Sequence, residues 1–172
     1  MKYKCNCCGQ EHDEWPALTF SSPTAYNQLT EEEKNELGKL SNDFCVITYP
    51  DQTDRFIRCT LTQKVTDHCD NLDYGIWVSL SEKSYQDYYD NYNNDNHVTE
   101  YFGWLCSSIS EYDKTLSIPT TVKTRTGNNL PEVIPHQNLD HPFVKDYYNG
   151  ITKEEAERRI KSMLIKTGQL ND

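Results

Sequence analysis

The sequence predicts an α+β fold, with a mostly antiparallel sheet of five or six strands and three or four helices packed on one face and one edge of it. Three observations support this class: short apolar runs separated by turn residues, helix caps ahead of amphipathic stretches, and a zinc-knuckle-like turn near the N-terminus. We expect a single domain over residues 1–172, with a possible metal knuckle at 1–14, a sheet-and-helix core at 15–150 and a C-terminal helix at 151–168.

The first predicted element is a cysteine-rich turn. Cys5 and Cys8 are separated by two residues and followed by Gly9, a spacing that lets both thiolates face one metal ion while the chain reverses direction. His12 is close enough in sequence to be a third ligand, so structural zinc is the expected metal. A reduced cysteine cluster without metal, and a catalytic metal or redox pair, are the alternatives. The fourth ligand must come from a distant position, and spacing does not choose among the candidates Cys45, Cys59, Cys69, Cys106 and His141.

A short helix and a hairpin follow. Thr30 and Glu33 have the spacing of a capping box, which predicts a helix over residues 30–40. Residues 44–49 and 55–61 are rich in β-branched and aromatic side chains and are separated by a proline-containing turn. This pattern predicts two strands paired as a hairpin.

The centre of the chain is a buried strand that runs directly into an aromatic helix. Residues 76–80 are almost entirely apolar, which predicts a strand buried on both faces. Ser81 has the character of an N-cap for the helix that follows. The next four tyrosines recur at helical spacing and predict one aromatic face that packs on the sheet; they are Tyr85, Tyr88, Tyr89 and Tyr92.

Two further strands are predicted in the second half of the chain. Residues 101–106 form one of them, and Gly103 within it allows a neighbour such as the Trp77 ring to approach the backbone closely. Residues 115–122 form the other, and Pro119 marks it as an edge or bulged strand.

Two helices end the chain. Asp140 is the predicted N-cap of the first, which Gly150 terminates. Thr152 and Glu155 repeat the capping-box spacing at the start of the second, and Gly168 ends it.

Charge is unevenly distributed along the chain. The formal net charge is −10, and the segment from Asp67 to Asp113 holds ten acidic residues against the single base Lys83, together with seven of the twelve tyrosines. Binding to nucleic acid is disfavoured because phosphates require the opposite charge. The sequence has no apolar signal segment and no run of apolar residues long enough for a membrane span, so we expect a cytoplasmic protein.

The acidic segment suits a basic protein partner. Carboxylates accelerate encounter with a cationic surface, and tyrosines supply apolar contact together with a hydroxyl group. Small acidic proteins that neutralise basic toxins, as immunity proteins or inhibitors do, have this character. The residues we expect to bind the partner are Glu82, Asp87, Tyr88, Asp90, Tyr92, Asp95 and Glu100. The competing interpretation is a solvated acidic face with the aromatic side chains packed beneath it.

No sequence motif predicts a reaction. The chain lacks the nucleophile-elbow, zinc-protease, P-loop and dinucleotide patterns. We therefore favour a non-catalytic binding module. The alternative is a metal- or thiol-dependent enzyme that uses the N-terminal Cys/His cluster.

Six ordered blocks of the sequence carry a family resemblance. They are C-x-x-C-G-x-x-H from Cys5 to His12, Trp15-Pro16, Asp43-Phe44-Cys45-Val46-Ile47, Gly75-Ile76-Trp77-Val78-Ser79-Leu80-Ser81, Tyr101-Phe102-Gly103-Trp104-Leu105, and Asp140-His141-Pro142 with Gly150-Ile151-Thr152. Over residues 5–157 the chain resembles the bacterial family catalogued as domain of unknown function 2199. The resemblance implies that Cys5, Cys8 and His12 act together and favours Cys45 or His141 as the remote ligand. It implies no activity.

Overall fold

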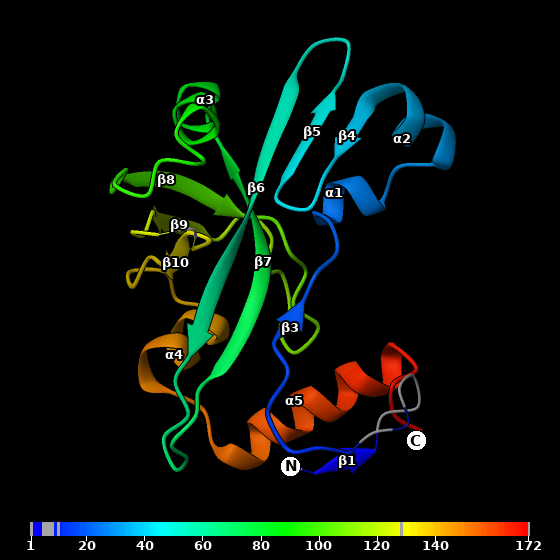
Figure 1. The fold of residues 1–172 in the computed structure, drawn as a ribbon, viewed down its shortest axis with the longest axis vertical. Helices are drawn as coiled ribbons and strands as arrows, with labels where there is room; N and C mark the ends of the chain where they lie inside the picture. The colour runs from blue at the N-terminus through cyan, green and yellow to red at the C-terminus, as the bar shows by residue number, and fades with distance from the viewer. Residues whose placement is uncertain (1, 5–8, 10, 128, 172) are drawn as a thin grey trace.

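The computed structural model describes residues 2–4, 9, 11–127 and 129–171, which form five α-helices and ten β-strands (Figure 1). In chain order these elements are β1 (Tyr3–Lys4), β2 (Glu11–His12), β3 (Leu18–Thr19), α1 (Thr24–Asn27), α2 (Glu31–Leu37), β4 (Gly38–Leu40), β5 (Phe44–Thr48), β6 (Thr53–Gln63), β7 (Leu72–Leu80), α3 (Glu82–Asp90), β8 (Glu100–Leu105), β9 (Pro119–Lys123), β10 (Glu132–Pro135), α4 (Pro142–Asn149) and α5 (Lys153–Lys166). None of the helices in this part of the chain has the length and apolar character needed to cross a membrane.

Eight strands form one sheet, in the order β3-β7-β8-β9-β10-β6-β5-β4. Because β7 also pairs with β6, the five strands from β6 to β10 close into a barrel. Pairing within the barrel is antiparallel except between β10 and β6, where Glu132 lies opposite Thr60 in a parallel contact. β1 and β2 form a separate antiparallel hairpin in which Tyr3 lies opposite His12.

The α+β class and the mainly antiparallel pairing agree with the sequence prediction, but the predicted count of five or six strands is wrong, and closure of the sheet into a barrel was not predicted. β6 has 11 residues and β7 has nine, so each pairs with the other along one edge and has room for two further strands along the second edge: β5 and β10 on β6, and β3 and β8 on β7. The twist that accumulates across β8 and β9 brings β10 back to β6 and closes the barrel. The predicted number of helices is also too low, since α1 adds a single turn ahead of α2.

The predicted strand at 115–122 is misplaced. Lys114 and Ser117 have φ angles of 55° and 64°, which are left-handed conformations that a strand does not contain. β9 therefore starts only at Pro119, where the missing N–H costs no ladder bond. β10, which is four residues long, was not predicted.

The barrel interior holds the main hydrophobic core. Alternate residues of each strand point inward, as expected for a sheet with one buried face. The inward side chains with no exposed surface include Ile57, Cys59, Leu61, Ile76, Val78, Leu105, Val122 and Val133.

Helices cover both ends of the barrel instead of one face and an edge. Tyr85 and Tyr88 of α3 extend the core at one end. Phe143 of α4 and Ile160 of α5 extend it at the opposite end, where β6 and β7 meet their connecting loop (Figure 1). A site on α3 is therefore separated from a site on α5 by the length of the barrel.

Local capping signals position two of the helices as predicted. The Ser81 hydroxyl accepts a bond from the backbone N–H three residues later and starts α3. Thr30 and Glu33 form the complete capping box of α2.

The cap of α4 differs from the prediction. His141, and not Asp140, is its N-cap, because the imidazole Nδ1 accepts the backbone N–H two residues later. Thr152 caps α5 as predicted, but the Glu155 carboxylate turns to arginines of its own helix.

A second, smaller core lies on the outer side of β5, β6 and β7. Cys45, Ile47, Phe56 and Trp77 form it with at most 3% exposure, and side chains of α1 pack on it. The Trp77 indole Nε1 donates to the Phe20 carbonyl at 2.9 Å, which satisfies its polar atom.

Candidate binding surface

α3 separates its tyrosines from its acids. Tyr85 and Tyr88 turn toward the barrel and retain 9% and 7% exposure. Both rings pack on the Phe44 ring, at centroid distances of 5.9 and 5.8 Å. Tyr89 is the exposed tyrosine of this helix, at 54%. The aromatic face predicted from the sequence therefore belongs mainly to the core, and the acidic side of the helix faces solvent.

Two of the acids predicted to bind a partner are ion-paired on the surface. Glu82 contacts Arg55 at 2.7 Å, and Glu100 contacts Lys123 at 2.8 Å. Both carboxylates are largely exposed, so each pair contributes little to stability and can exchange partners.

Asp87 is the most constrained of the predicted acids. It accepts a bond from the Tyr101 hydroxyl at 2.6 Å, and His97 Nε2 lies 3.0 Å from the same carboxylate oxygen. The Tyr101 hydrogen bond is the largest cause that lowers the pKa of Asp87. Asp90 and Asp95, by contrast, have no ion-pair partner within the described residues.

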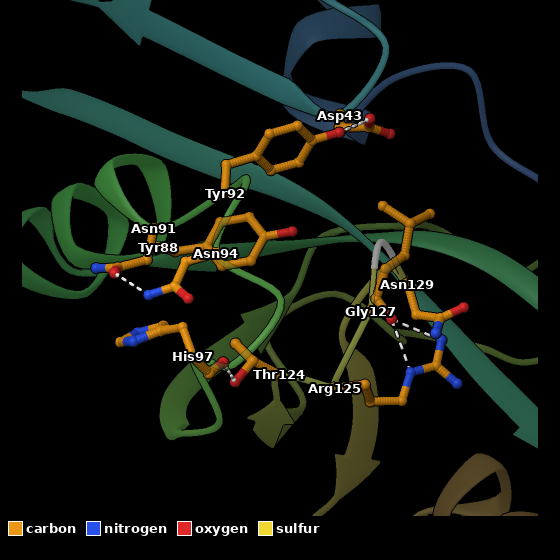
Figure 2. A pocket seen from close by; sticks show the side chains of 11 residues that line it. Asp43, Tyr88, Asn91, Tyr92, Asn94, His97, Thr124, Arg125, Gly127 and Asn129 are labelled. Carbon is orange, nitrogen blue, oxygen red and sulfur yellow. Dashed lines mark hydrogen bonds between the residues drawn. The ribbon is translucent and has the colours of Figure 1, made fainter.

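A polar pocket of about 260 Å³ lies between the C-terminal part of α3 and the loop that joins β9 to β10 (Figure 2). Tyr88 and Tyr92, both predicted to contact a partner, line it. The Tyr92 hydroxyl donates to the Asp43 carboxylate at 2.5 Å, and this bond is the main cause that raises the pKa of Tyr92 to about 12. The Tyr88 hydroxyl points into the pocket and has no hydrogen-bond partner among the described residues (Figure 2). The two tyrosines therefore line a recess and do not lie on an open surface.

An exposed aromatic surface lies on the outside of the barrel. Phe102 and Trp104 of β8 are 51% and 45% exposed, and their rings meet edge to face at a centroid distance of 4.9 Å. The His136 imidazole lies 5.7 Å from the Phe102 ring and is held by the Thr121 hydroxyl at 3.2 Å. We call Phe102, Trp104 and His136 the aromatic platform.

Strand alternation explains why these rings face solvent. Tyr101, Gly103 and Leu105 point into the barrel, so the two residues between them must point out. The strand itself was predicted from the sequence, but its exposed outer face was not. Period-two alternation was the signal that identifies Phe102 and Trp104.

A row of charges borders the aromatic platform. Lys123 of β9 lies directly between Glu100 of β8 and Glu132 of β10 in the sheet register. Two carboxylates therefore flank one ammonium group, which leaves the row with an excess of negative charge.

The predicted metal ligands fall into two groups. Cys5 and Cys8 lie outside the described residues, and the backbone of His12 belongs to β2. Cys45 is fully buried in the second core, and burial raises the pKa of its thiol to about 12. His141 uses both ring nitrogens, since Nδ1 caps α4 and Nε2 donates to the Asp113 carbonyl at 2.7 Å. The Cys45 thiol is therefore shielded by the second core, and both nitrogens of His141 are already hydrogen-bonded, so neither side chain is well placed to be the remote ligand.

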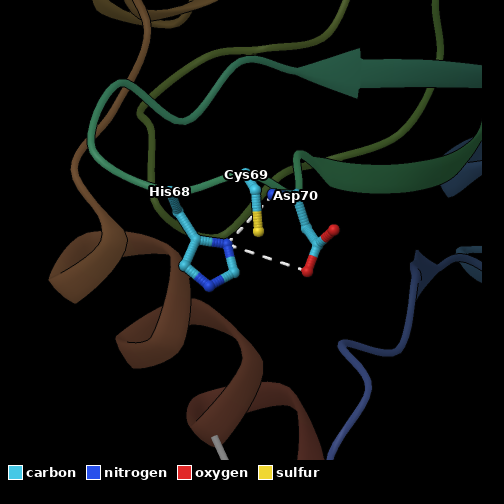
Figure 3. Close-up of side chains that lie close together, drawn as sticks. All are labelled: His68, Cys69 and Asp70. Atoms are coloured by element: carbon cyan, nitrogen blue, oxygen red, sulfur yellow. Dashed lines mark hydrogen bonds and ion pairs between the residues drawn. The ribbon is translucent and has the colours of Figure 1, made fainter.

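A different group of metal-binding side chains lies in the loop between β6 and β7. The ligand atoms of His68, Cys69 and Asp70 all lie within 4.8 Å of one another (Figure 3). The His68 ring stacks on the Trp15 ring at a centroid distance of 4.5 Å and an interplanar angle of 14°. Because Trp15 follows His12 by three residues, this stacking connects the loop to the N-terminal region.

The comparisons with known proteins give one result. The sequence model of a family described as an uncharacterized protein conserved in bacteria (DUF2199) matches residues 4–151. No curated protein and no solved structure matches the chain.

Proposed function

Because the chain belongs to DUF2199, a bacterial family of uncharacterised proteins, we propose its function from its surface: a non-catalytic binding module that docks a basic protein partner. The aromatic platform and the acids around it form the docking surface. The protein then acts by contact, as an immunity protein or an inhibitor does.

The exposure of Phe102 and Trp104 carries this proposal. A soluble protein normally buries rings of this size, and contiguous exposed aromatic side chains mark interaction sites. Aromatic residues also dominate the energetic centres of protein interfaces. Both rings project from a barrel strand that is hydrogen-bonded on either edge, so the surface is rigid before a partner arrives.

Charge supports a basic partner. Glu100 and Glu132 border the aromatic platform, and the whole chain has a formal charge of −10. Long-range attraction of this sign increases the rate of encounter with a cationic surface and rejects acidic proteins. Asp90 and Asp95 add carboxylates at the α3 end of the barrel, where Glu82 and Asp87 are also located.

The proposal is tested by capture and reconstitution. Tagged full-length protein is used to isolate partners from a lysate of the bacterium that encodes it, and the captured protein is then purified and titrated. We expect a protein of high isoelectric point whose capture is lost in the Phe102→Ser/Trp104→Ser double variant and at about 0.5 M salt. Leu40→Ser is the matched control, because Leu40 is also an apolar strand residue and is 41% exposed. Capture that is unchanged by the double variant, or a captured partner that is acidic, contradicts the proposal.

We also propose a structural zinc ion, held by Cys5, Cys8 and His12 together with a remote ligand. The group of His68, Cys69 and Asp70 supports the β6–β7 loop as the source of that ligand, in place of Cys45 or His141. Thiolate and imidazole are the ligands zinc prefers in closed tetrahedral sites. Zinc bound there supplies folding free energy by tying the N-terminal turn to the end of the barrel.

The reactivity of the proposed zinc ligands distinguishes a binding module from a metal- or thiol-dependent enzyme. A closed four-ligand site protects Cys5 and Cys8 from a thiol reagent until a chelator removes the zinc. Cysteines that react at once in the zinc-loaded protein would favour the enzyme.

A further inference from the structure

We propose that Arg58 and Arg125 form a binding site for an oxyanion, the phosphate or carboxylate group of a small ligand. The Arg125 guanidinium contacts Thr60 of β6, and the Arg58 guanidinium lies over Gly75, the cross-strand partner of Thr60. This site is separate from the aromatic platform, which is formed by two residues of β8 and the residue that follows β10.

The ion pairs of the arginines single out these two. Arg55 pairs with Glu82, Arg158 with Glu155, and Arg159 with Glu155 and Asp146. Among the described residues, Arg58 and Arg125 are the arginines without a carboxylate partner. An acidic chain with 27 acids and 17 bases offers many possible partners, so two unpaired guanidinium groups on one strand face call for an explanation.

Arg58 is half-buried, and its Nε is shielded from solvent with no acceptor among the described residues. A buried donor without an acceptor is destabilising, and native proteins rarely leave one unless a ligand, ion or water completes it. The guanidinium extends over Gly75 of the neighbouring strand. A methyl group at Gly75 would lie 3.5 Å from Nη2 of Arg58 and 3.1 Å from Cγ2 of Thr19, so the glycine leaves the guanidinium its space.

The strand register brings the two arginines together. Gly75 is the cross-strand partner of Thr60, so the Arg58 guanidinium reaches toward the Thr60 position. Nη2 of Arg125 donates to the Thr60 hydroxyl at 3.0 Å and also to the Leu130 carbonyl. Directly opposed residues of an antiparallel pair have Cα atoms about 5 Å apart, and the proposed anion lies between the two guanidinium groups at this step of the ladder.

The chemistry of the pair selects an oxyanion. Guanidinium remains charged at any physiological pH and presents its N–H groups in a planar fork that matches carboxylate and phosphate oxygens. The Asp43 carboxylate reduces the positive potential, because Asp43 lines the same pocket as Arg125 and its backbone carbonyl accepts the backbone N–H of Arg58. The Asp43 carboxylate accepts a hydrogen bond from the Tyr92 hydroxyl. The two guanidinium groups still outnumber this single carboxylate, so the region keeps a net positive charge.

Calorimetric titration of the full-length protein with inorganic phosphate and, separately, with citrate tests the site, at constant ionic strength set with sodium chloride. We expect saturable binding of at least one probe, and the stronger probe identifies the ligand class. Arg58→Gln and Arg125→Gln should each weaken binding by about tenfold or more. Arg55→Gln is the matched control, because Arg55 lies on the same strand but is paired with Glu82, and it should leave the affinity within about twofold.

Arg125 is exposed, so Arg125→Gln is expected to fold even if Arg58→Gln does not. Binding of neither probe, or equal weakening by all three substitutions, overturns the proposal. A negative result in this experiment would not contradict the proposed docking surface, because neither Arg58 nor Arg125 belongs to the aromatic platform.

Discussion

Phe102 and Trp104 meet edge to face on the outside of β8, with an interplanar angle of 89°. This arrangement is favoured for aromatic pairs, so the two rings hold each other in place in the free protein. A partner that docks on them loses little affinity to side-chain ordering.

The network around Asp87 predicts different effects for two buried tyrosines. Tyr101→Phe removes the hydrogen bond to Asp87, and we expect it to lower the free energy of unfolding by about 2 kcal/mol. Tyr88→Phe removes a hydroxyl that has no partner among the described residues, and we expect a change within about 0.5 kcal/mol. Urea unfolding measures both. Equal losses would contradict the assignment, as would an Asp87 pKa, followed by NMR, that fails to rise in Tyr101→Phe.

Glu155 should make stability depend on pH in the acid range. Hydrogen bonds from Arg158, and then from Arg159, lower the pKa of Glu155 to about 2. Because the folded-state pKa is lower than the ordinary value of about 4.3, the stabilisation is complete above that value and is lost as the pH falls toward 2.

The variant Glu155→Gln should abolish this part of the acid dependence. Among the described residues, it leaves the buried Arg159 with Asp146 as its one carboxylate partner, at 3.4 Å, so we expect a loss of up to about 3 kcal/mol at pH 7. Thermal unfolding at pH 7 and pH 3 compares the two proteins. An identical pH dependence for both would show that Glu155 does not contribute to it.

Gly103 should not tolerate a side chain. A methyl group there would overlap Cγ1 of Val78 and approach the Ser79 carbonyl to 3.0 Å, so Gly103→Ala is expected to cost about 1–3 kcal/mol. Val78→Ala made together with Gly103→Ala should restore part of this loss, because it removes the overlapping atom. Additive losses in the double variant, measured by urea unfolding, would contradict the packing.

Zinc binding should depend on the β6–β7 loop. We expect about one zinc ion per chain in protein purified without chelator, and an affinity lowered by about tenfold or more in Cys69→Ser and His68→Gln. Cys106→Ser is the control, because Cys106 is half-buried and donates to the Trp104 carbonyl. Elemental analysis and competition with a chromogenic chelator give the values. Full zinc retention in both loop variants would remove the loop from the site.

Much of the local structure was predictable because its signals lie close together in sequence. The Ser81 cap, the Thr30 capping box and the hairpin of β5 with β6 all follow from residues within one turn or one loop. Barrel closure could not be predicted, since it depends on the contact of Glu132 with Thr60 across more than seventy residues. The predicted neighbour of Gly103, the Trp77 ring, was wrong because Trp77 faces the outside of the barrel. Val78 faces the inside and is the side chain that approaches Gly103.

Of the aromatic platform and the acids that border it, the sequence prediction included Glu100 but not Phe102, Trp104, His136 or Glu132. Acids of the same sequence segment separate in space: Asp67 accepts the Lys153 N–H at the start of α5 at 2.6 Å, whereas Asp90 ends α3 at the opposite end of the barrel (Figure 1). Tyr88 turned inward because a helix buries its most continuous apolar stripe. The exposed rings of Phe102 and Trp104 follow from strand alternation, which is readable only once the inward face of β8 is assigned.

The affinity of the purified basic partner for the Trp104→Ser variant tests the account most directly. We predict that the substitution weakens binding by at least about tenfold relative to the unmodified protein, while its free energy of unfolding stays within about 0.5 kcal/mol of the unmodified value. The control Leu40→Ser should leave the binding free energy unchanged within about 0.5 kcal/mol. An unchanged dissociation constant in Trp104→Ser would contradict the claim that this protein acts through the outer face of its barrel.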